Sequence, residues 1–130
     1  MNGLLVDTQL LVWMGYAPQR LASSLVTELV DRQRDIRYSV VSLWEVAIKA
    51  SLGRDDFQVN PLALRKGLLE QGFKELTIQA DHVLTVQHLP RIHRDPFDRL
   101  LVAQATREGL RLLTADRTLL GYGEAVRWVG

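Results

Sequence analysis

The segment that most constrains the fold is Arg94–Ala105, with the sequence RDPFDRLLVAQA. Asp95 followed by Pro96 is typical of a helix start: aspartate caps the free N–H groups of the first turn, and proline is tolerated at the first helical position. Apolar residues then recur three, four and seven positions after Asp98, on one helix face. We therefore expect a buried helix whose apolar stripe begins at Asp98.

Asp98 is unusual because its carboxylate then points toward the core side of that helix. A carboxylate in such a place costs free energy unless it is paired, capped or bound to a metal ion. The helix N-terminus offsets part of the cost. A capping arrangement with Asp95 would also explain the residue, so this segment alone leaves a structural and a functional role open.

The composition is that of an ordinary globular protein. A chain of 130 residues suits one domain with a real core, and 47% of the residues are hydrophobic. The net charge of +1 gives no bulk argument for nucleic-acid binding, although it allows a local basic patch. There is no cysteine, which excludes disulfides and thiolate metal sites.

The N-terminal segment has no basic region followed by a long apolar run, so we expect no signal peptide. No stretch approaches the length of a membrane span, and we expect no membrane partner. The expected compartment is the cytoplasm.

Short β-rich runs alternate with helical patterns along the chain. The expected strands are residues 3–6, 38–41, 74–78, 110–113 and 126–129. The expected helices cover residues 10–14, a stretch opened by Pro18, and residues 43–52, 61–71, 80–88 and 96–108. This alternation predicts a three-layer α/β/α fold around a central, mostly parallel sheet of about five strands.

Glu45 has two local explanations that compete with a functional one. Ser42 is the expected N-cap, and Glu45 three residues later completes a capping box. Glu45 and Lys49 also form a stabilising pair four residues apart. His82 and His88 have no partner at a recognisable ligand spacing, so we expect both at the surface and not on a metal.

Four acidic residues come where strands end or helices begin at the same sheet edge: Asp7, Glu45, Asp98 and Asp116. Ligands of parallel sheets bind beyond the carboxyl ends of the strands. Four carboxylates meeting there need a cation, because like charges raise one another's pKa. Mg²⁺ suits an all-oxygen site, with Mn²⁺ as a substitute. The chemistry indicated is metal-assisted phosphoryl transfer.

Basic residues flank these acidic positions in the sequence: Arg91, His93, Arg94, Arg99 and Arg117. They can bind the phosphates of a single strand or form a solvated rim, and the sequence favours neither. Trp13 and Tyr122 are candidates for base stacking, although core packing is the expected role of Trp13.

Four segments, taken in order, resemble one family: LLVDTQLLVW at residues 4–13, SVVSLWEVAIK at 39–49, RDPFDRLLVAQA at 94–105 and LLTADR at 112–117. The chain resembles the PIN-domain ribonucleases and, more narrowly, the VapC-type toxins of bacterial toxin–antitoxin pairs. The resemblance implies a single PIN domain over residues 1–130 and an acidic metal site of Asp7, Glu45, Asp98 and Asp116. It selects Asp98 over Asp95, which is left as a cap.

The function that the resemblance implies is a Mg²⁺-dependent endoribonuclease toxin, in which metal-activated water hydrolyses RNA phosphodiester bonds. It also implies a homodimer and a cognate antitoxin that occludes the site. We expect an apolar groove for the antitoxin within residues 21–52, whose two helices carry more apolar positions than one buried face requires.

Other classes fit less well. Phosphatases of the haloacid dehalogenase type carry the motif Asp-x-Asp after the first strand. Here the residue two positions after Asp7 is Gln9, so the second aspartate is missing. A receiver domain needs an acceptor aspartate directly after the third strand, where only Asp81 lies near. The remaining alternative is a non-catalytic RNA- or protein-binding module with a vestigial site.

Overall fold

A computed structural model describes residues 3–130, and its centre is one sheet of five parallel strands. The strands are β1 (Leu4–Val6), β2 (Ile36–Ser39), β3 (Lys74–Leu76), β4 (Arg111–Thr114) and β5 (Val126–Trp128). Their order is β3-β2-β1-β4-β5, and all neighbouring pairs are parallel. The predicted α/β fold is confirmed. The strand order reverses at β1, the place where parallel sheets bind ligands.

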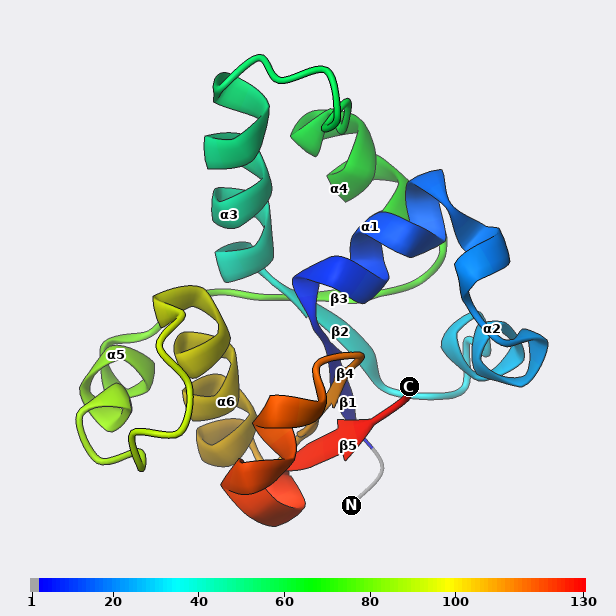
Figure 1. Cartoon of the computed structure of the whole chain (residues 1–130). Helices are drawn as coiled ribbons and strands as arrows, with labels where there is room; N and C mark the ends of the chain where they lie inside the picture. Colours follow the sequence, from blue (N-terminus) through cyan, green and yellow to red (C-terminus); the bar gives the residue numbers. More distant parts are fainter. Residues whose placement is uncertain (1–2) are drawn as a thin grey trace.

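Helices cover both faces of the sheet (Figure 1). The α-helices are α1 (Thr8–Tyr16), α2 (Ser23–Leu29), α3 (Val40–Ser51), α4 (Pro61–Glu70), α5 (Ala80–Val86) and α6 (Pro96–Glu108). Two 3₁₀ segments, η1 (Pro18–Arg20) and η2 (Arg117–Ala125), complete the set. None of the helices within residues 3–130 is long and apolar enough to cross a membrane.

The side chains of β1 alternate between two hydrophobic cores. Leu4 and Val6 pack in a core with residues of α1, α2 and α4. Leu5 packs in a second core with residues of α6 and η2. This period of two is the ordinary consequence of strand geometry, and it places one helical layer on each face. The carboxyl ends of the strands therefore lie between the two helical layers.

The helix at residues 96–108 begins and ends where the sequence predicts. Asp95 accepts hydrogen bonds from the N–H groups of Phe97 and Asp98, at 2.8 and 3.3 Å. Gly109 ends α6 with φ of 66°, a left-handed conformation that glycine adopts without strain. Asp95 is therefore the cap, and Asp98 is free of that role.

The predicted boundary between the second strand and its helix is wrong. β2 ends at Ser39, and Val40 is already the first residue of α3. The Ser39 hydroxyl accepts a hydrogen bond from the Val41 N–H at 3.0 Å and caps the helix. The valines suggested a strand because β-branched residues favour strands, but the pairing of β2 with β3 stops at Ser39. Ser42 is not a cap, so the predicted capping box with Glu45 does not exist.

The helix predicted to open at Pro18 is also interrupted. Pro18 begins only the single turn η1, and α2 starts at Ser23. Between them, Leu21 and Ala22 have extended backbone, with ψ of 138° and 142°. The break lets Leu21 pack against the first core while α2 turns Leu25 and Leu29 toward it.

Candidate functional site

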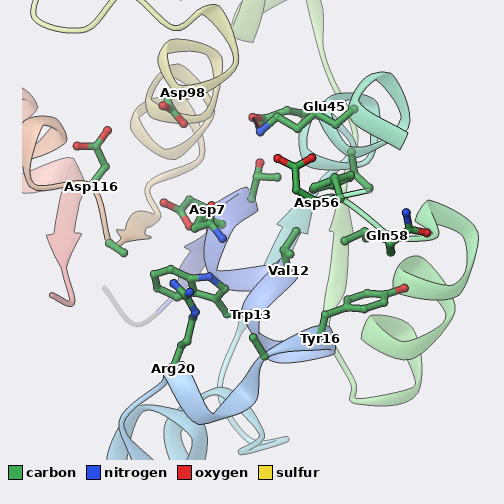
Figure 2. Close-up of a pocket in the computed structure, with 18 of the residues that line it drawn as sticks. Asp7, Val12, Trp13, Tyr16, Arg20, Glu45, Asp56, Gln58, Asp98 and Asp116 are labelled. Atoms are coloured by element: carbon green, nitrogen blue, oxygen red, sulfur yellow. Dashed lines mark ion pairs between the residues drawn. The ribbon is translucent and has the colours of Figure 1, made fainter. Parts of the chain in front are cut away.

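The carboxyl end of the sheet opens into an acidic cleft of about 770 Å³. All four predicted carboxylates line it, and they come from the end of β1, from α3, from α6 and from the start of η2 (Figure 2). Asp56 and the capping residue Asp95 also line the cleft. Residues far apart in the sequence are thus collected at the predicted edge of the sheet.

Asp7 directly follows β1 and is buried, with 4% of its surface exposed. Its Oδ1 accepts a hydrogen bond from the Leu10 N–H at 2.9 Å, which caps α1, and its Oδ2 accepts one from the Thr114 hydroxyl. Burial raises the pKa of Asp7 to about 6, and the charge of Glu45 adds to the rise, against the lowering effect of these hydrogen bonds. The fold therefore holds a carboxylate where its charge is unfavourable.

Glu45 lies on α3 and is also buried, with 8% exposed. Its Oε2 forms the predicted ion pair with the Lys49 Nζ at 3.1 Å. Its Oε1 is buried and has no hydrogen-bond partner among residues 3–130. An unpaired buried oxygen costs about 1–3 kcal/mol, so this atom is suited to a ligand that the protein itself does not supply.

Asp98 lies in the first turn of α6 and faces the same cleft. Its pKa is raised to about 7, mainly by burial and also by the charges of Asp95, Glu45 and Asp7, against the lowering effect of His93. The carboxylate of Asp98 therefore lies in the field of three other acids that face the same cleft.

Asp116 follows β4 and begins η2, where its Oδ1 accepts a hydrogen bond from the Thr118 N–H at 3.0 Å. Its Oδ2 lies 2.9 Å from the His93 Nε2. Burial alone would raise the pKa of Asp116, but the hydrogen bonds from His93 and Thr118 outweigh it and leave the pKa below the usual value. The pKa of Asp116 is thus shifted in the direction opposite to those of Asp7 and Asp98.

Two residues that support these carboxylates are not among the site residues predicted from the sequence. Thr114 is fully buried; its hydroxyl donates to Asp7 and accepts from the Asp116 N–H at 3.0 Å. His93, which the sequence groups with the flanking arginines, instead contacts Asp116 and Asp98. The available signals were a hydroxyl residue two positions before Asp116 and a histidine two positions before the cap Asp95.

Comparison with known sequences identifies the family of this chain. The sequence pattern of the PIN domain matches residues 4–124. The chain belongs to the PIN-domain family. The protein is also similar to Ribonuclease VapC22 of Mycobacterium tuberculosis, with 29% identity over 123 residues that cover 94% of this chain and 93% of the relative. The predicted resemblance to VapC-type PIN domains is confirmed.

Solved structures show the same fold for this PIN domain. VapBC2 from Rickettsia felis, bound to a DNA fragment from its promoter, has a TM-score of 0.73 at 14% identity, covering 97% of this chain and 96% of that one. DNA-bound VapBC from Salmonella typhimurium has a TM-score of 0.71 at 15% identity, covering 99% and 98%. At such identities the likeness concerns the fold.

The basic residues that flank the acidic positions in the sequence are not equivalent in this PIN domain. Arg91 and Arg94 are exposed, whereas Arg99 donates a hydrogen bond from Nη2 to the Val86 carbonyl at 2.9 Å. The Arg117 guanidinium lies 5.4 Å from the centre of the Trp128 ring. Arg99 therefore connects α6 with α5, and Arg91, Arg94, Arg99 and Arg117 are not among the residues that line the cleft.

Two aromatic residues have mixed roles. Trp13 packs against the first core and also lines the cleft, with the Arg20 guanidinium 5.4 Å from the centre of its ring. Tyr122 packs against the second core, and its hydroxyl accepts a hydrogen bond from the His93 N–H at 3.1 Å. The expected core packing of Trp13 is confirmed in part.

The expectation for the other histidines is wrong for one of them. His88 is exposed, but His82 is fully buried between α5 and α6. Its Nε2 lies 2.8 Å from the Glu108 Oε2, and its Nδ1 accepts from the Gln79 N–H at 3.0 Å. These hydrogen bonds satisfy a buried ring far from the cleft, so His82 has a structural role.

Proposed function

We propose that this PIN domain is a divalent-metal-dependent endoribonuclease that acts as the toxin of a toxin–antitoxin pair. The observation that carries the proposal is the convergence of Asp7, Glu45, Asp98 and Asp116 on one cleft, with two of them strongly raised in pKa. The names of the similar proteins support it: one is a ribonuclease, and the structural neighbours are toxin–antitoxin complexes.

The residues present fit a hard divalent cation. The four proposed ligands offer only oxygen atoms, which Mg²⁺ and Mn²⁺ prefer. A cation would partner the Glu45 Oε1, which is otherwise unpaired among the described residues, and relieve the repulsion that raises the pKa of Asp98. We propose Mg²⁺ as the natural ion, with Mn²⁺ as a substitute.

The contacts in the cleft indicate what each side chain contributes. When bound, the cation supplies Lewis-acid stabilisation of phosphate charge and lowers the pKa of water. Thr114 and the first turn of α1 hold both oxygens of Asp7, and Lys49 holds one oxygen of Glu45. Arg20 and Lys49, which also line the cleft, are placed to contact the phosphates of an RNA strand. The chain itself therefore binds and orients, and needs no protein nucleophile.

We further propose that the chain is a single PIN domain over residues 1–130, acting in the cytoplasm as a homodimer. Strand β5 lies beyond the residues matched by the family pattern, yet it pairs with β4 in the same sheet. This pairing supports a domain that extends past residue 124.

For the antitoxin, we keep the proposal of a surface within residues 21–52. Two apolar residues of α3, Trp44 and Ile48, are exposed, as is its C-cap residue Leu52. By contrast α2 buries Leu25 and Leu29, so α3 is the better candidate of the two helices. Hydrogen exchange should show protection of α3 when the antitoxin binds, and unchanged exchange across residues 21–52 would contradict this surface.

The proposed activity is tested by cleavage of a mixed RNA pool with purified protein in Mg²⁺. We expect cleavage that is lost in EDTA and falls at least about 100-fold in Asp98→Asn, because the variant removes an oxygen charge from the cation site. Asp55→Asn makes the same change at an exposed loop residue outside the cleft, and should cleave like the unmodified protein.

Equal cleavage by the unmodified protein and by Asp98→Asn would contradict the site or reveal a contaminating nuclease. If no RNA is cleaved and the protein binds no Mn²⁺, the proposed enzyme is wrong and the chain is a binding module.

A further inference from the structure

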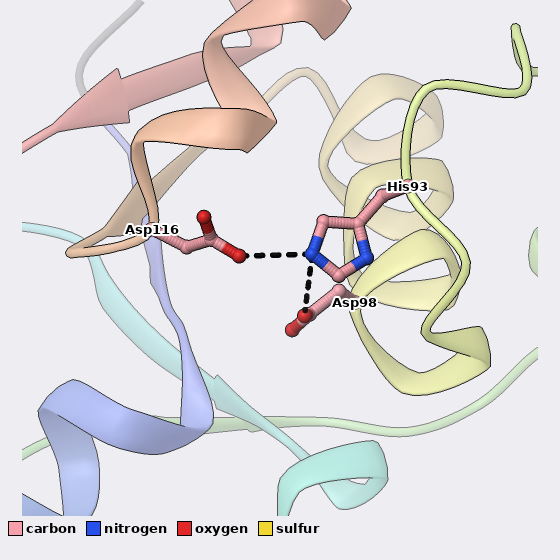
Figure 3. Close-up of side chains that lie close together, drawn as sticks. All are labelled: His93, Asp98 and Asp116. Carbon is pink, nitrogen blue, oxygen red and sulfur yellow. Dashed lines mark hydrogen bonds and ion pairs between the residues drawn. The ribbon is translucent and has the colours of Figure 1, made fainter.

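His93 lies beside Asp98 and Asp116, two of the acids that line the cleft, in the loop that leads from α5 to α6 (Figure 3). Its Nε2 lies 2.9 Å from the Asp116 Oδ2 and 3.6 Å from the Asp98 Oδ2. One ligand atom of each of the three residues lies within 4.8 Å of the others, a spacing that a shared metal ion could bridge. His93 could therefore be a fifth ligand, or a hydrogen-bond donor that orients a carboxylate.

The other ring nitrogen distinguishes these roles. The Asp95 N–H donates a hydrogen bond to the His93 Nδ1 at 3.0 Å. A nitrogen that accepts from a backbone N–H carries no proton, so in the neutral ring the proton is on Nε2. A protonated Nε2 has no lone pair for a metal ion. It can only donate, and the carboxylate oxygen at hydrogen-bond distance is that of Asp116.

The surrounding contacts fix this geometry from both sides. The His93 N–H donates to the Tyr122 Oη at 3.1 Å, and Tyr122 belongs to η2, the segment that Asp116 begins. Asp95, whose N–H orients the ring, is the N-cap of α6, the helix that carries Asp98. His93 is thus held between the two elements that supply Asp98 and Asp116.

We propose that His93 is a positioning residue that holds the Asp116 carboxylate in the cleft through its Nε2–H, and that it is not a metal ligand. This inference rests on the proposed function, because Asp116 matters only if the cleft binds a cation. Groups that hydrogen-bond a metal-binding carboxylate typically change metal affinity 10–100-fold when they are removed. The role of His93 is therefore measurable as a binding constant, apart from any cleavage.

The test is a cycle of Mn²⁺ titrations followed by electron paramagnetic resonance. The variants are His93→Leu, His93→Gln, Asp116→Ala and the double variant His93→Leu/Asp116→Ala, with His88→Leu as the matched control at an exposed histidine. We expect His93→Leu to weaken Mn²⁺ binding roughly 10–100-fold. His93→Gln keeps an N–H donor near the same place and should restore most of the affinity, which a loss of folding would not allow.

The double variant decides between the two roles. A residue that acts only through Asp116 has nothing left to position once Asp116 is gone, so the double variant should bind Mn²⁺ like Asp116→Ala alone. A further loss of about tenfold on adding His93→Leu would show an independent ligand and overturn the proposal. Binding by His93→Leu equal to that of the unmodified protein would overturn it as well.

The ring nitrogens give a second readout that does not depend on metal binding. In nitrogen-15 spectra of the metal-free protein, we expect a protonated Nε2 and an unprotonated Nδ1 for His93, unchanged when Mg²⁺ is added. A proton on Nδ1, or loss of the Nε2 proton on adding Mg²⁺, would contradict the positioning role. Failure of the unmodified protein to bind Mn²⁺ would instead count against the proposed function, and the tautomer would still be determined.

Discussion

At the scale of single residues, Thr114 connects two of the four carboxylates. Its hydroxyl donates to Asp7 and accepts from the backbone of Asp116, and no part of the residue is exposed. The bond to Asp7 joins the ends of β1 and β4, which are neighbours in the sheet, and the bond from the Asp116 N–H orders the turn that follows β4. The predictable part of the site is its acids; the residue that joins them is visible only in three dimensions.

Thr114→Val should lower the free energy of unfolding by about 1–3 kcal/mol, because it leaves a buried acceptor and a buried donor unpaired. Thr114→Ser keeps the hydroxyl and loses only a methyl group, at about 1 kcal/mol. Urea denaturation in EDTA compares the two variants. Equal stability of the valine and serine variants would show that the hydroxyl is energetically unimportant.

Asp98 gives a prediction about pH. Burial and neighbouring acids raise its pKa from 3.8 to about 7 in the folded protein. Between these values the folded state binds more protons than the unfolded state, so the stability of the metal-free protein falls as the pH rises. The penalty is absent below about pH 4 and complete above about pH 7.

Asp98→Asn removes this penalty. The metal-free variant should be more stable than the unmodified protein at pH 8 by roughly 1–3 kcal/mol, and the difference should vanish near pH 4. Urea denaturation in EDTA at the two pH values measures it, with Asp55→Asn as the control. A variant that is less stable than the unmodified protein at pH 8 would show that the Asp98 charge is not strained.

At the scale of elements, α6 could be predicted from the sequence and the start of α3 could not. The signals of α6 are local: the cap Asp95, Pro96 and the terminal Gly109. For α3, the local β propensity of Val40 and Val41 opposes the helix, and the outcome depends on where β2 stops pairing with β3. Contacts between distant segments decided this boundary, and no local pattern contains them.

The contacts of His82 and His93 could not be predicted for the same reason, because they join segments that are distant in the sequence. The burial of His82 depends on the packing of α5 against α6 and on Glu108, which lies 26 residues away. The contact of His93 with Asp116 spans 23 residues. Asp7, Asp98 and Asp116 could be proposed from the sequence because each comes just after a strand or in the first turn of a helix, and Glu45 lies in the second turn of the helix after β2. A side chain that supports these acids can come from any loop.

A substitution at Ser39 tests whether this residue caps the start of α3. Its hydroxyl accepts from the Val41 N–H and donates to the Gln104 Oε1 at 2.5 Å, and both side chains are fully buried. Ser39→Ala should therefore cost about 2 kcal/mol of stability, from the lost cap and the unpaired Gln104. Ser51→Ala at the exposed end of the same helix is the control, and should cost about 0.5 kcal/mol or less. Equal costs in chemical denaturation would contradict the assigned cap.

At the scale of the whole molecule, the cleft joins elements from the two layers and from the middle of the sheet. Asp7 directly follows β1, α3 carries Glu45, α6 carries Asp98 and Asp116 is the N-cap of η2. A cation held by all four would bind the folded state alone, because the unfolded chain does not bring these residues together. Ion binding and global stability are therefore linked.

Mg²⁺ at ten times its dissociation constant should stabilise the protein by about 1.4 kcal/mol. Thermal unfolding followed by circular dichroism should show the melting temperature rising with Mg²⁺ concentration. The same titration of Asp98→Asn should give little or no rise, because a ligand is missing. An equal rise in both proteins would place the stabilising ion elsewhere.

The most direct test of the metal site is a crystal of the protein soaked in Mn²⁺, with data recorded for anomalous scattering. We expect a Mn²⁺ peak in the cleft, bound by oxygens of Asp7, Glu45, Asp98 and Asp116, and no such peak in crystals of Asp98→Asn. A cleft without Mn²⁺, or a peak coordinated by other residues, would contradict the assignment of these carboxylates as the metal centre.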